Sequence, residues 1–207
     1  MIGTATIRDF LHELSAREPT PGGGAAGALH AAQAAALIGM VARYSTGAKY
    51  VAFAQECAEI QARADAHRDC SLRLADADAA AFQGVIGAYQ LPKASPEEAA
   101  ARSRAIQDAL VAAADPPRSL VGVARGVVTL GERLADFANP NVISDVAAAA
   151  EAARAAAATA RVNLDINSAS ITDPVRKASL AAAVADADET IRAAEALSAR
   201  VRKQILS

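Results

Sequence analysis

The sequence contains no tryptophan, and aromatic residues make up only 3% of its 207 positions. It also lacks runs in which β-branched and polar residues alternate, the pattern typical of half-buried strands. Alanine dominates instead, and its small side chain lets helix backbones approach closely. These features exclude a β-rich fold and predict an all-α protein whose long helices pack as a bundle.

Basic runs are missing as well, and the formal net charge is −2, so nucleic acid is not an expected partner. The chain has only two cysteines, Cys57 and Cys70, and both fall on one predicted helix. Thirteen residues apart, they point about 140° away from each other, so they do not form a disulfide within that helix. They also lack the spacing of a metal site. We therefore expect reduced core cysteines, no metal and a cytoplasmic protein.

The first residues have no basic segment followed by an apolar one, so no signal peptide is expected. Positions 24–42 carry no charged residue, and this run approaches the length of a membrane span. It consists mostly of Ala and Gly, however, and includes His30 and Gln33. We interpret it as a helix buried on all sides, with His30 in the core, and expect no membrane association.

The chain is long enough for one domain, residues 1–207, with a sizeable core. Ser95-Pro96 with Glu98 has the pattern of a capping box, and Asp173-Pro174 is a second helix start. Thr4 is a candidate cap for the first helix. The predicted helices cover residues 4–17, 24–44, 49–89, 95–114, 115–138, 144–170 and 173–206.

The most informative stretch is the loop Pro19-Thr20-Pro21-Gly22-Gly23-Gly24. Its prolines favour extended backbone, and its glycines leave room for a ligand to approach. A glycine loop that leads into a helix N-terminus offers free N–H groups and the positive end of the helix dipole. The glycines alone fit equally well a ligand-binding loop or a tight loop that lets two helices pack closely.

The order of residues in this loop resembles the cyclodeaminase/cyclohydrolase family of folate enzymes. That family includes formiminotetrahydrofolate cyclodeaminases and bacterial methenyltetrahydrofolate cyclohydrolases. Further matches follow in the same order along nearly the whole chain: Thr46-Gly47-Ala48-Lys49-Tyr50, Asp78-Ala79-Ala80-Ala81-Phe82, Ala88-Tyr89-Gln90-Leu91-Pro92-Lys93, Asn139-Pro140-Asn141-Val142-Ile143-Ser144-Asp145 and Asn163-Leu164-Asp165-Ile166-Asn167.

The resemblance implies a homodimeric enzyme that acts on a one-carbon-substituted tetrahydrofolate and needs no cofactor beyond that substrate. We expect hydrolysis of 5,10-methenyltetrahydrofolate to 10-formyltetrahydrofolate. The first alternative is 5-formiminotetrahydrofolate cyclodeaminase activity, which releases ammonia. An alternative of another class is a non-catalytic helical dimer that binds folate or serves as a scaffold. Substrate-binding residues implied by the motifs are Thr20, Pro21, Gly22, Gly23, Gly24, Lys49, Lys93, Asn141, Ser144, Asp145, Asn163 and Asn167.

Asp78 is the candidate catalytic residue. It falls on an apolar stripe with Leu74 and Phe82, and buried carboxylates are rare unless they are paired or functional. Burial raises a carboxyl pKa and makes proton transfer near neutral pH feasible. A structural ion pair is the alternative role. Asp76 falls on the other side of the helix beside Arg73, where we expect solvated ion pairs.

A second polar face lies on the predicted helix 144–170, where Asn163 and Asn167 share a side with Asp145. Uncharged amides suit hydrogen bonding to a pterin-like ring edge or across a subunit interface. Asp145 and Asn163 are roughly 27 Å apart along the axis, so they cannot both touch one reacting centre. Asp145 fits a binding role and a favourable charge at the helix start equally well.

Lys49 and Lys93 are each either a partner for the glutamate tail of a folate or an ordinary exposed lysine. His12 and His67 lie among charged residues, so we expect both at the surface.

Overall fold

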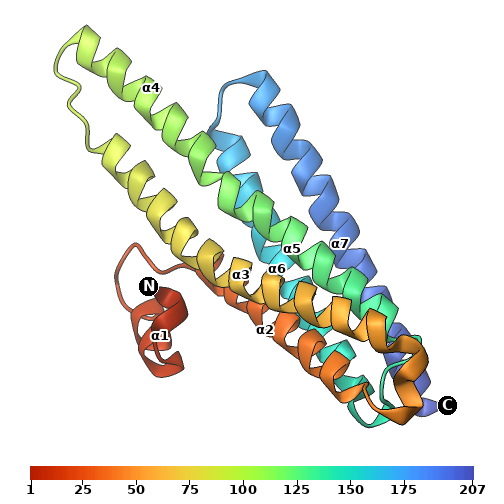
Figure 1. Ribbon diagram of the computed structural model, residues 1–207. Helices are drawn as coiled ribbons and strands as arrows, with labels where there is room; N and C mark the ends of the chain where they lie inside the picture. The colour runs from red at the N-terminus through yellow and green to blue at the C-terminus, as the bar shows by residue number, and fades with distance from the viewer.

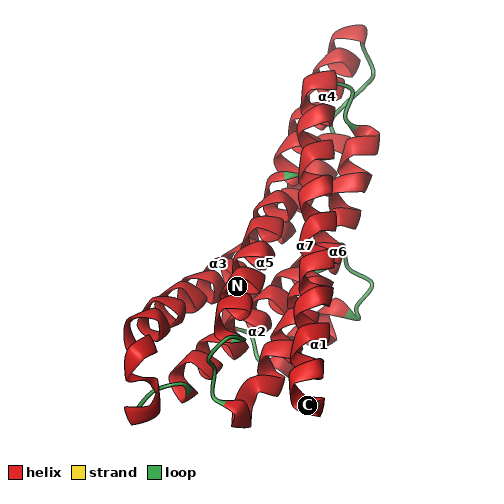
Figure 2. Ribbon diagram, turned by 90° about the vertical axis from the view of Figure 1, so that its right-hand side faces the viewer, coloured by secondary structure: helices red, strands yellow, loops and turns green.

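The computed structural model describes all 207 residues and contains helices only, so the all-α prediction is confirmed. Figure 2 shows helices joined by short loops throughout the chain. The α-helices are α1 (Ile7–Leu14), α2 (Gly23–Tyr44), α3 (Ala54–Tyr89), α4 (Pro96–Ala113), α5 (Asp115–Leu134), α6 (Ile143–Ser170) and α7 (Pro174–Leu206). Short 3-10 turns cover Ile2–Thr4 (η1), Ala48–Phe53 (η2) and Pro140–Val142 (η3).

Helix α2 lies at the centre of the bundle and packs against α3, α5 and α6. Helices α6 and α7 form a long pair, and α3 and α4 extend beyond α2 to form one end of an elongated molecule (Figure 1). The short α1 stands beside the start of α2, away from the main bundle (Figure 1). The loop between α1 and α2 is therefore placed against the flank of α3.

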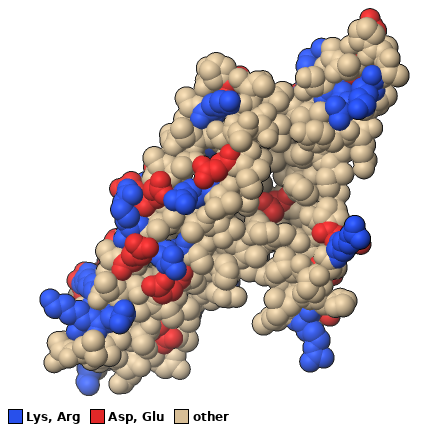
Figure 3. All heavy atoms as spheres, turned by 180° about the vertical axis from the view of Figure 1, so that it is seen from behind, with Lys and Arg blue, Asp and Glu red and all other residues tan.

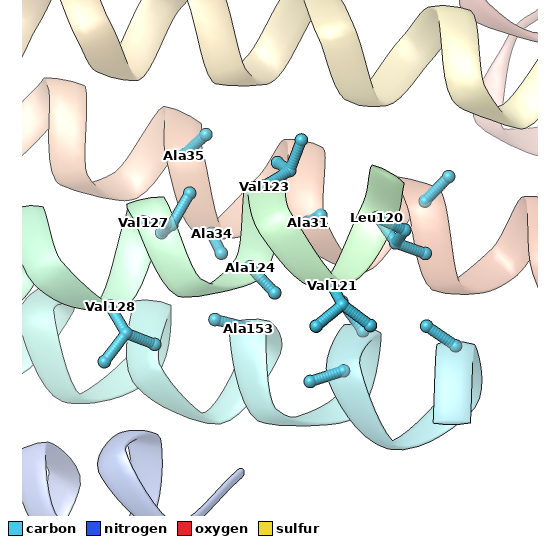
Figure 4. Packing of buried hydrophobic residues seen from close by; sticks show 14 of the residues in the cluster. Ala31, Ala34, Ala35, Leu120, Val121, Val123, Ala124, Val127, Val128 and Ala153 are labelled. Carbon is cyan, nitrogen blue, oxygen red and sulfur yellow. The ribbon is translucent and has the colours of Figure 1, made fainter. Parts of the chain in front are cut away.

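The core consists largely of alanine, as the composition predicts, together with valine, leucine and isoleucine. Figure 4 shows Ala31, Ala34 and Ala35 of α2 next to the valines of α5, with Ala153 of α6 on the other side. The helices approach so closely that a β-carbon at Gly27 would lie 2.9 Å from Cγ2 of Thr159. Small residues on α2 thus let one helix contact three others without leaving voids.

Two of the predicted helix starts are confirmed in detail. The Ser95 hydroxyl accepts from the Glu98 amide at 3.1 Å, and the Glu98 carboxylate in turn accepts from the Ser95 amide, which completes a capping box. Asp173 accepts from the amides of Val175 and Arg176.

Other predicted boundaries were wrong. Thr6 rather than Thr4 caps α1, because residues 2–4 form a 3-10 turn. Helix α3 begins at Ala54 rather than residue 49, since a 3-10 turn precedes it, and α5 ends at Leu134 rather than residue 138.

Within a single chain, α2 is not buried on all sides. Its outer face leaves His30 and Gln33 exposed, so His30 is not a core residue. By length and apolar composition α2 meets the criteria for a membrane span, and 61% of that apolar segment is buried inside the bundle.

His67 corrects another expectation. It is half-buried rather than at the surface, and its imidazole packs on α5 where Gly126 leaves space. Burial, reinforced by the positive charge of Arg63, lowers the pKa of His67.

Candidate active site

A cavity of about 360 Å³ opens where the loop before α2 meets α3, α4 and α6. Figure 3 shows the molecule from the side where its surface is hollowed, between the α1 region and the α3–α4 end. The volume is in the range of small-molecule sites. The cavity is lined by Pro19, Thr20, Gly22, Gly23, Gly24, Asp78, Phe82, Val85, Tyr89, Leu110, Ala113, Asn163, Ile166 and Asn167.

Asp78 of α3 caps the N-terminus of α2 from a neighbouring helix. The N-cap residue of α2, Gly22, provides no side-chain cap, and the Ala25 amide donates a hydrogen bond to the Asp78 carboxylate instead. The carboxylate lies directly against Gly24, where any β-carbon would overlap it. Glycine at position 24 is therefore required by close approach of the carboxylate.

Two opposing effects act on the protonation of Asp78. Burial raises the pKa of its carboxyl group, and the hydrogen bond from the Ala25 amide lowers it. Burial is the larger effect, so the pKa lies above the usual range for aspartate. A carboxyl group shifted in this direction exchanges protons more readily near neutral pH than a solvated aspartate does.

The remaining polar groups of the cavity are neutral. The Gln83 amide donates to the Thr20 hydroxyl at 3.2 Å, which ties the glycine loop to α3. Asn167 Nδ2 donates to the Ala113 carbonyl at 3.2 Å, which links α6 to α4. The Asn163 side chain makes no hydrogen bond within the protein, so its amide is available to a ligand.

Asp78 is the only charged residue of the cavity lining. The site therefore favours a ligand that places a cationic group near Asp78. No group of three or more His, Cys, Asp or Glu side chains is arranged to hold a metal ion.

The apolar stripe predicted on α3 packs in the core only in part: Leu74 contacts the core cluster, whereas Phe82 and Tyr89 do not. Phe82 is 46% exposed and Tyr89 is 50% exposed, and both line the cavity together with Val85. At 100° per residue, Phe82, Val85 and Tyr89 all fall within about 40° of Asp78 on the helix surface. The stripe thus forms an elongated wall with aromatic faces suited to a planar ligand.

The structure brings together about half of the residues that the sequence suggested for the site. Thr20, the three loop glycines, Asp78, Asn163 and Asn167 line one cavity. Pro21 belongs to the same loop, and its peptide bond with Thr20 is cis.

The other suggested residues lie elsewhere. Asn139 Nδ2 donates to the Tyr44 carbonyl at 3.0 Å, which holds the turn before α6 at the C-terminal end of α2. Helix α2 is about 33 Å long, and the cavity is at its N-terminal end. Lys93 lies in the exposed loop after α3. The residues at the far end of α2 are Lys49, Asn141, Ser144 and Asp145.

Asp76 does not occupy the solvated face that its position predicted. It is half-buried and accepts a hydrogen bond from the Ile2 amide at 2.7 Å. The expected ion pairs with Arg73 are not formed, and Asp69 pairs with Arg68 at 2.9 Å instead. Asp76 thus fastens the N-terminal segment to α3.

Sequence reasoning missed the contribution of α4 to the site. Leu110 and Ala113 line the cavity, although the sequence of α4 has the pattern of an ordinary charged helix. It also missed Arg102, whose guanidinium group lies over the ring of Tyr89, 5.5 Å from its centre. Neither contribution leaves a signal in the local sequence, because both depend on how α4 folds back on α3.

The fold and cavity define an all-α bundle that presents a carboxylate and a glycine-rich loop to a ligand-sized space. The chain belongs to the formiminotransferase-cyclodeaminase family, whose sequence profile matches residues 6–186.

It is 38% identical over 174 residues to the methenyltetrahydrofolate cyclohydrolase of Methylorubrum extorquens, covering 84% of each protein. It is 32% identical to the formimidoyltransferase-cyclodeaminase of Rattus norvegicus, where 84% of the chain matches 32% of the longer relative. The crystal structure of formiminotetrahydrofolate cyclodeaminase from Thermotoga maritima superposes with a TM-score of 0.85 at 30% identity, covering 99% of this chain and 98% of that one.

Proposed function

We propose that the protein hydrolyses 5,10-methenyltetrahydrofolate to 10-formyltetrahydrofolate. The observation that carries this proposal is Asp78, a carboxylate with a raised pKa and the only charged residue in a cavity of about 360 Å³. The similarity to a methenyltetrahydrofolate cyclohydrolase across 84% of both chains supports the same reaction.

The substrate suits this cavity because its one-carbon unit is an amidinium-like cation between N5 and N10. The negative charge of Asp78 stabilises that cation. Water adds to the one-carbon atom and loses a proton to the Asp78 carboxylate, which acts as general base. The bond from that carbon to N5 then breaks as N5 takes the proton from Asp78 and the hydroxyl group loses its own proton, which leaves the formyl group on N10. Overall, the substrate cation and water give neutral 10-formyltetrahydrofolate and one proton.

Cyclodeamination of 5-formiminotetrahydrofolate is the second candidate, and the similarity to the Thermotoga maritima cyclodeaminase favours it. In that reaction N10 attacks the formimino carbon, and ammonia leaves from the tetrahedral intermediate. The same carboxylate would transfer the protons. A folate-binding protein without activity is the third candidate, and an inert Asp78 would favour it.

Absorbance of the methenyl chromophore distinguishes the candidates. Purified protein is mixed with 5,10-methenyltetrahydrofolate, and the decay is compared with buffer alone and with the Asp78→Asn variant. We expect rapid loss of the chromophore with the parent protein only. Formation of the same chromophore from 5-formiminotetrahydrofolate, with release of ammonia, would assign the cyclodeaminase reaction instead. Binding without turnover of either substrate would leave the non-catalytic candidate.

We also propose that the protein forms a homodimer through the outer face of α2. This face carries no charged side chain between positions 24 and 42, which is unusual for a helix in water. It leads to Tyr44, which is 58% exposed. Sedimentation at micromolar concentration should give twice the mass of the chain, and Met40→Glu on this face should shift it toward monomer. A monomeric parent protein would contradict the proposal.

A further inference from the structure

The cavity has one end that is negative and another that is bordered by an arginine. Asp78 marks the first end, and Tyr89 lies 11 residues further along α3, about 16 Å away along the helix axis. Arg102 reaches across from α4 and donates two hydrogen bonds to the Tyr89 carbonyl, from Nε at 3.2 Å and from a terminal nitrogen at 2.9 Å. The guanidinium group is thereby held over the ring of Tyr89, which lines the cavity, although Arg102 itself is not among the lining residues.

Arg102 retains hydrogen-bonding capacity in this position. Its two bonds to Tyr89 use two of the five N–H groups of the guanidinium. Arg102 forms no ion pair with a protein carboxylate, unlike Arg133, which pairs with Glu56 and Glu59 across α3 and α5. Figure 3 shows basic side chains gathered at the α3–α4 end, above the hollow. The positive charge at this edge is therefore available to an anionic group of a ligand.

We propose that Arg102 binds the glutamate carboxylates of the folate substrate, so that the substrate lies along α3 with its one-carbon unit beside Asp78. This inference rests on the proposed folate function. 5,10-Methenyltetrahydrofolate carries its cationic carbon near the pterin and its carboxylates beyond the aminobenzoyl ring, at the opposite end. The cavity has the matching order of charges, with aromatic side chains between them. Arg102 is a substrate-binding residue and takes no part in proton transfer.

A purely structural role for Arg102 is the alternative. Its bonds to the last carbonyl of α3 complement the negative end of the helix dipole and fasten α4 to α3. Loss of that role would weaken binding of every ligand to a similar degree. Loss of a carboxylate-binding role would weaken only ligands that carry the glutamate.

The test compares tetrahydrofolate with tetrahydropteroate, which lacks the glutamate, by titration calorimetry on the full-length protein. Arg102→Gln should weaken tetrahydrofolate binding about tenfold to a hundredfold, the range for a lost charge-assisted hydrogen bond, and leave tetrahydropteroate unchanged. Arg104→Gln is the matched control, because Arg104 is exposed and points about 200° away from Arg102 on α4. Equal weakening of both ligands, or of neither, would overturn the proposal.

The parent protein provides a second measurement in case Arg102→Gln does not fold. It should bind tetrahydrofolate at least tenfold more tightly than tetrahydropteroate, and the difference should shrink as salt is added. Equal affinities would overturn the proposal. These binding data do not depend on turnover. The protein could therefore prefer tetrahydrofolate and yet turn over neither one-carbon substrate. That result would refute the proposed reaction and retain the role of Arg102.

Discussion

The carboxyl group of Asp78 occupies the space that a β-carbon of residue 24 would fill, so α3 meets the first turn of α2 with no side chain between them. The contact places the candidate general base next to the amide groups at the N-terminus of α2. The carboxylate can keep this position only if residue 24 has no β-carbon.

Gly24→Ala should therefore displace Asp78. We expect kcat to fall by at least about tenfold, because small errors in the position of a reacting group are costly. Gly84→Ala is the control, since a β-carbon at position 84 has no protein atom within 4 Å and Gly84 does not line the cavity. Steady-state kinetics of the two variants provide the measurement. Equal activity of both would show that the contact at Gly24 is not needed for turnover.

Gly23→Val tests whether the glycine loop contacts the ligand. A β-carbon at position 23 has no protein atom within 4 Å, and Gly23 lines the cavity. We expect folate binding to be abolished while the free energy of unfolding changes by less than about 2 kcal/mol. Calorimetric titration and a thermal melt together test this prediction. Unchanged folate affinity would mean that the loop serves only to let the helices pack.

Asp78→Asn removes the titrating group and keeps the shape of the side chain. Turnover of the preferred folate substrate should fall by roughly 10²–10⁴, with little change in binding of tetrahydrofolate itself. Asp76→Asn is the matched control on the same helix, because Asp76 bonds to the Ile2 amide outside the cavity. If the two variants lose activity to the same extent, Asp78 is not the proton-transfer group.

The same substitution should change how stability depends on pH. Because burial raises the pKa of Asp78, the folded state favours the protonated form. The parent protein therefore loses stability relative to the Asp78→Asn variant as pH rises through the folded-state pKa of Asp78, because asparagine does not titrate. We expect the variant to melt at a higher temperature than the parent at pH 7.5. The gain should vanish at pH 3.5, and a gain of the same size at both pH values would contradict the assignment.

His67 should lower the stability of the protein as pH falls, whereas Asp78 lowers it as pH rises. Its pKa is lowered by burial, so the folded state disfavours the imidazolium form. Stability is then lost as pH falls below the ordinary histidine pKa of about 6.5. Urea denaturation at pH 7.5 and at pH 5.5 should show a smaller loss of stability for His67→Gln than for the parent protein. A reduction of the same size in His12→Gln, on the exposed face of α1, would contradict the assignment to His67.

The sequence determined which segments form helices and which residues share a helix face, because both depend on local sequence pattern. The absence of alternating β-branched runs, the alanine content and the signals at Ser95 and Asp173 were enough for the all-α architecture. The order of the motifs was enough for the family, which the match to residues 6–186 confirms. Helical periodicity also placed Asp78 on the same side of its helix as Phe82 and Tyr89.

Only the tertiary structure decided what that side of the helix faces. Periodicity shows that Phe82 and Tyr89 share a face, but the same apolar pattern fits a core and a cavity wall. Asp76 is bound by Ile2, which is far away in the sequence, and Arg102 reaches Tyr89 only because α4 folds back along α3. Likewise, the length of α2 separates Gly23 from Lys49, although both belong to sequence motifs that suggest one site. Local spacing specifies which residues share a helix face, whereas the packing of distant segments specifies which faces meet.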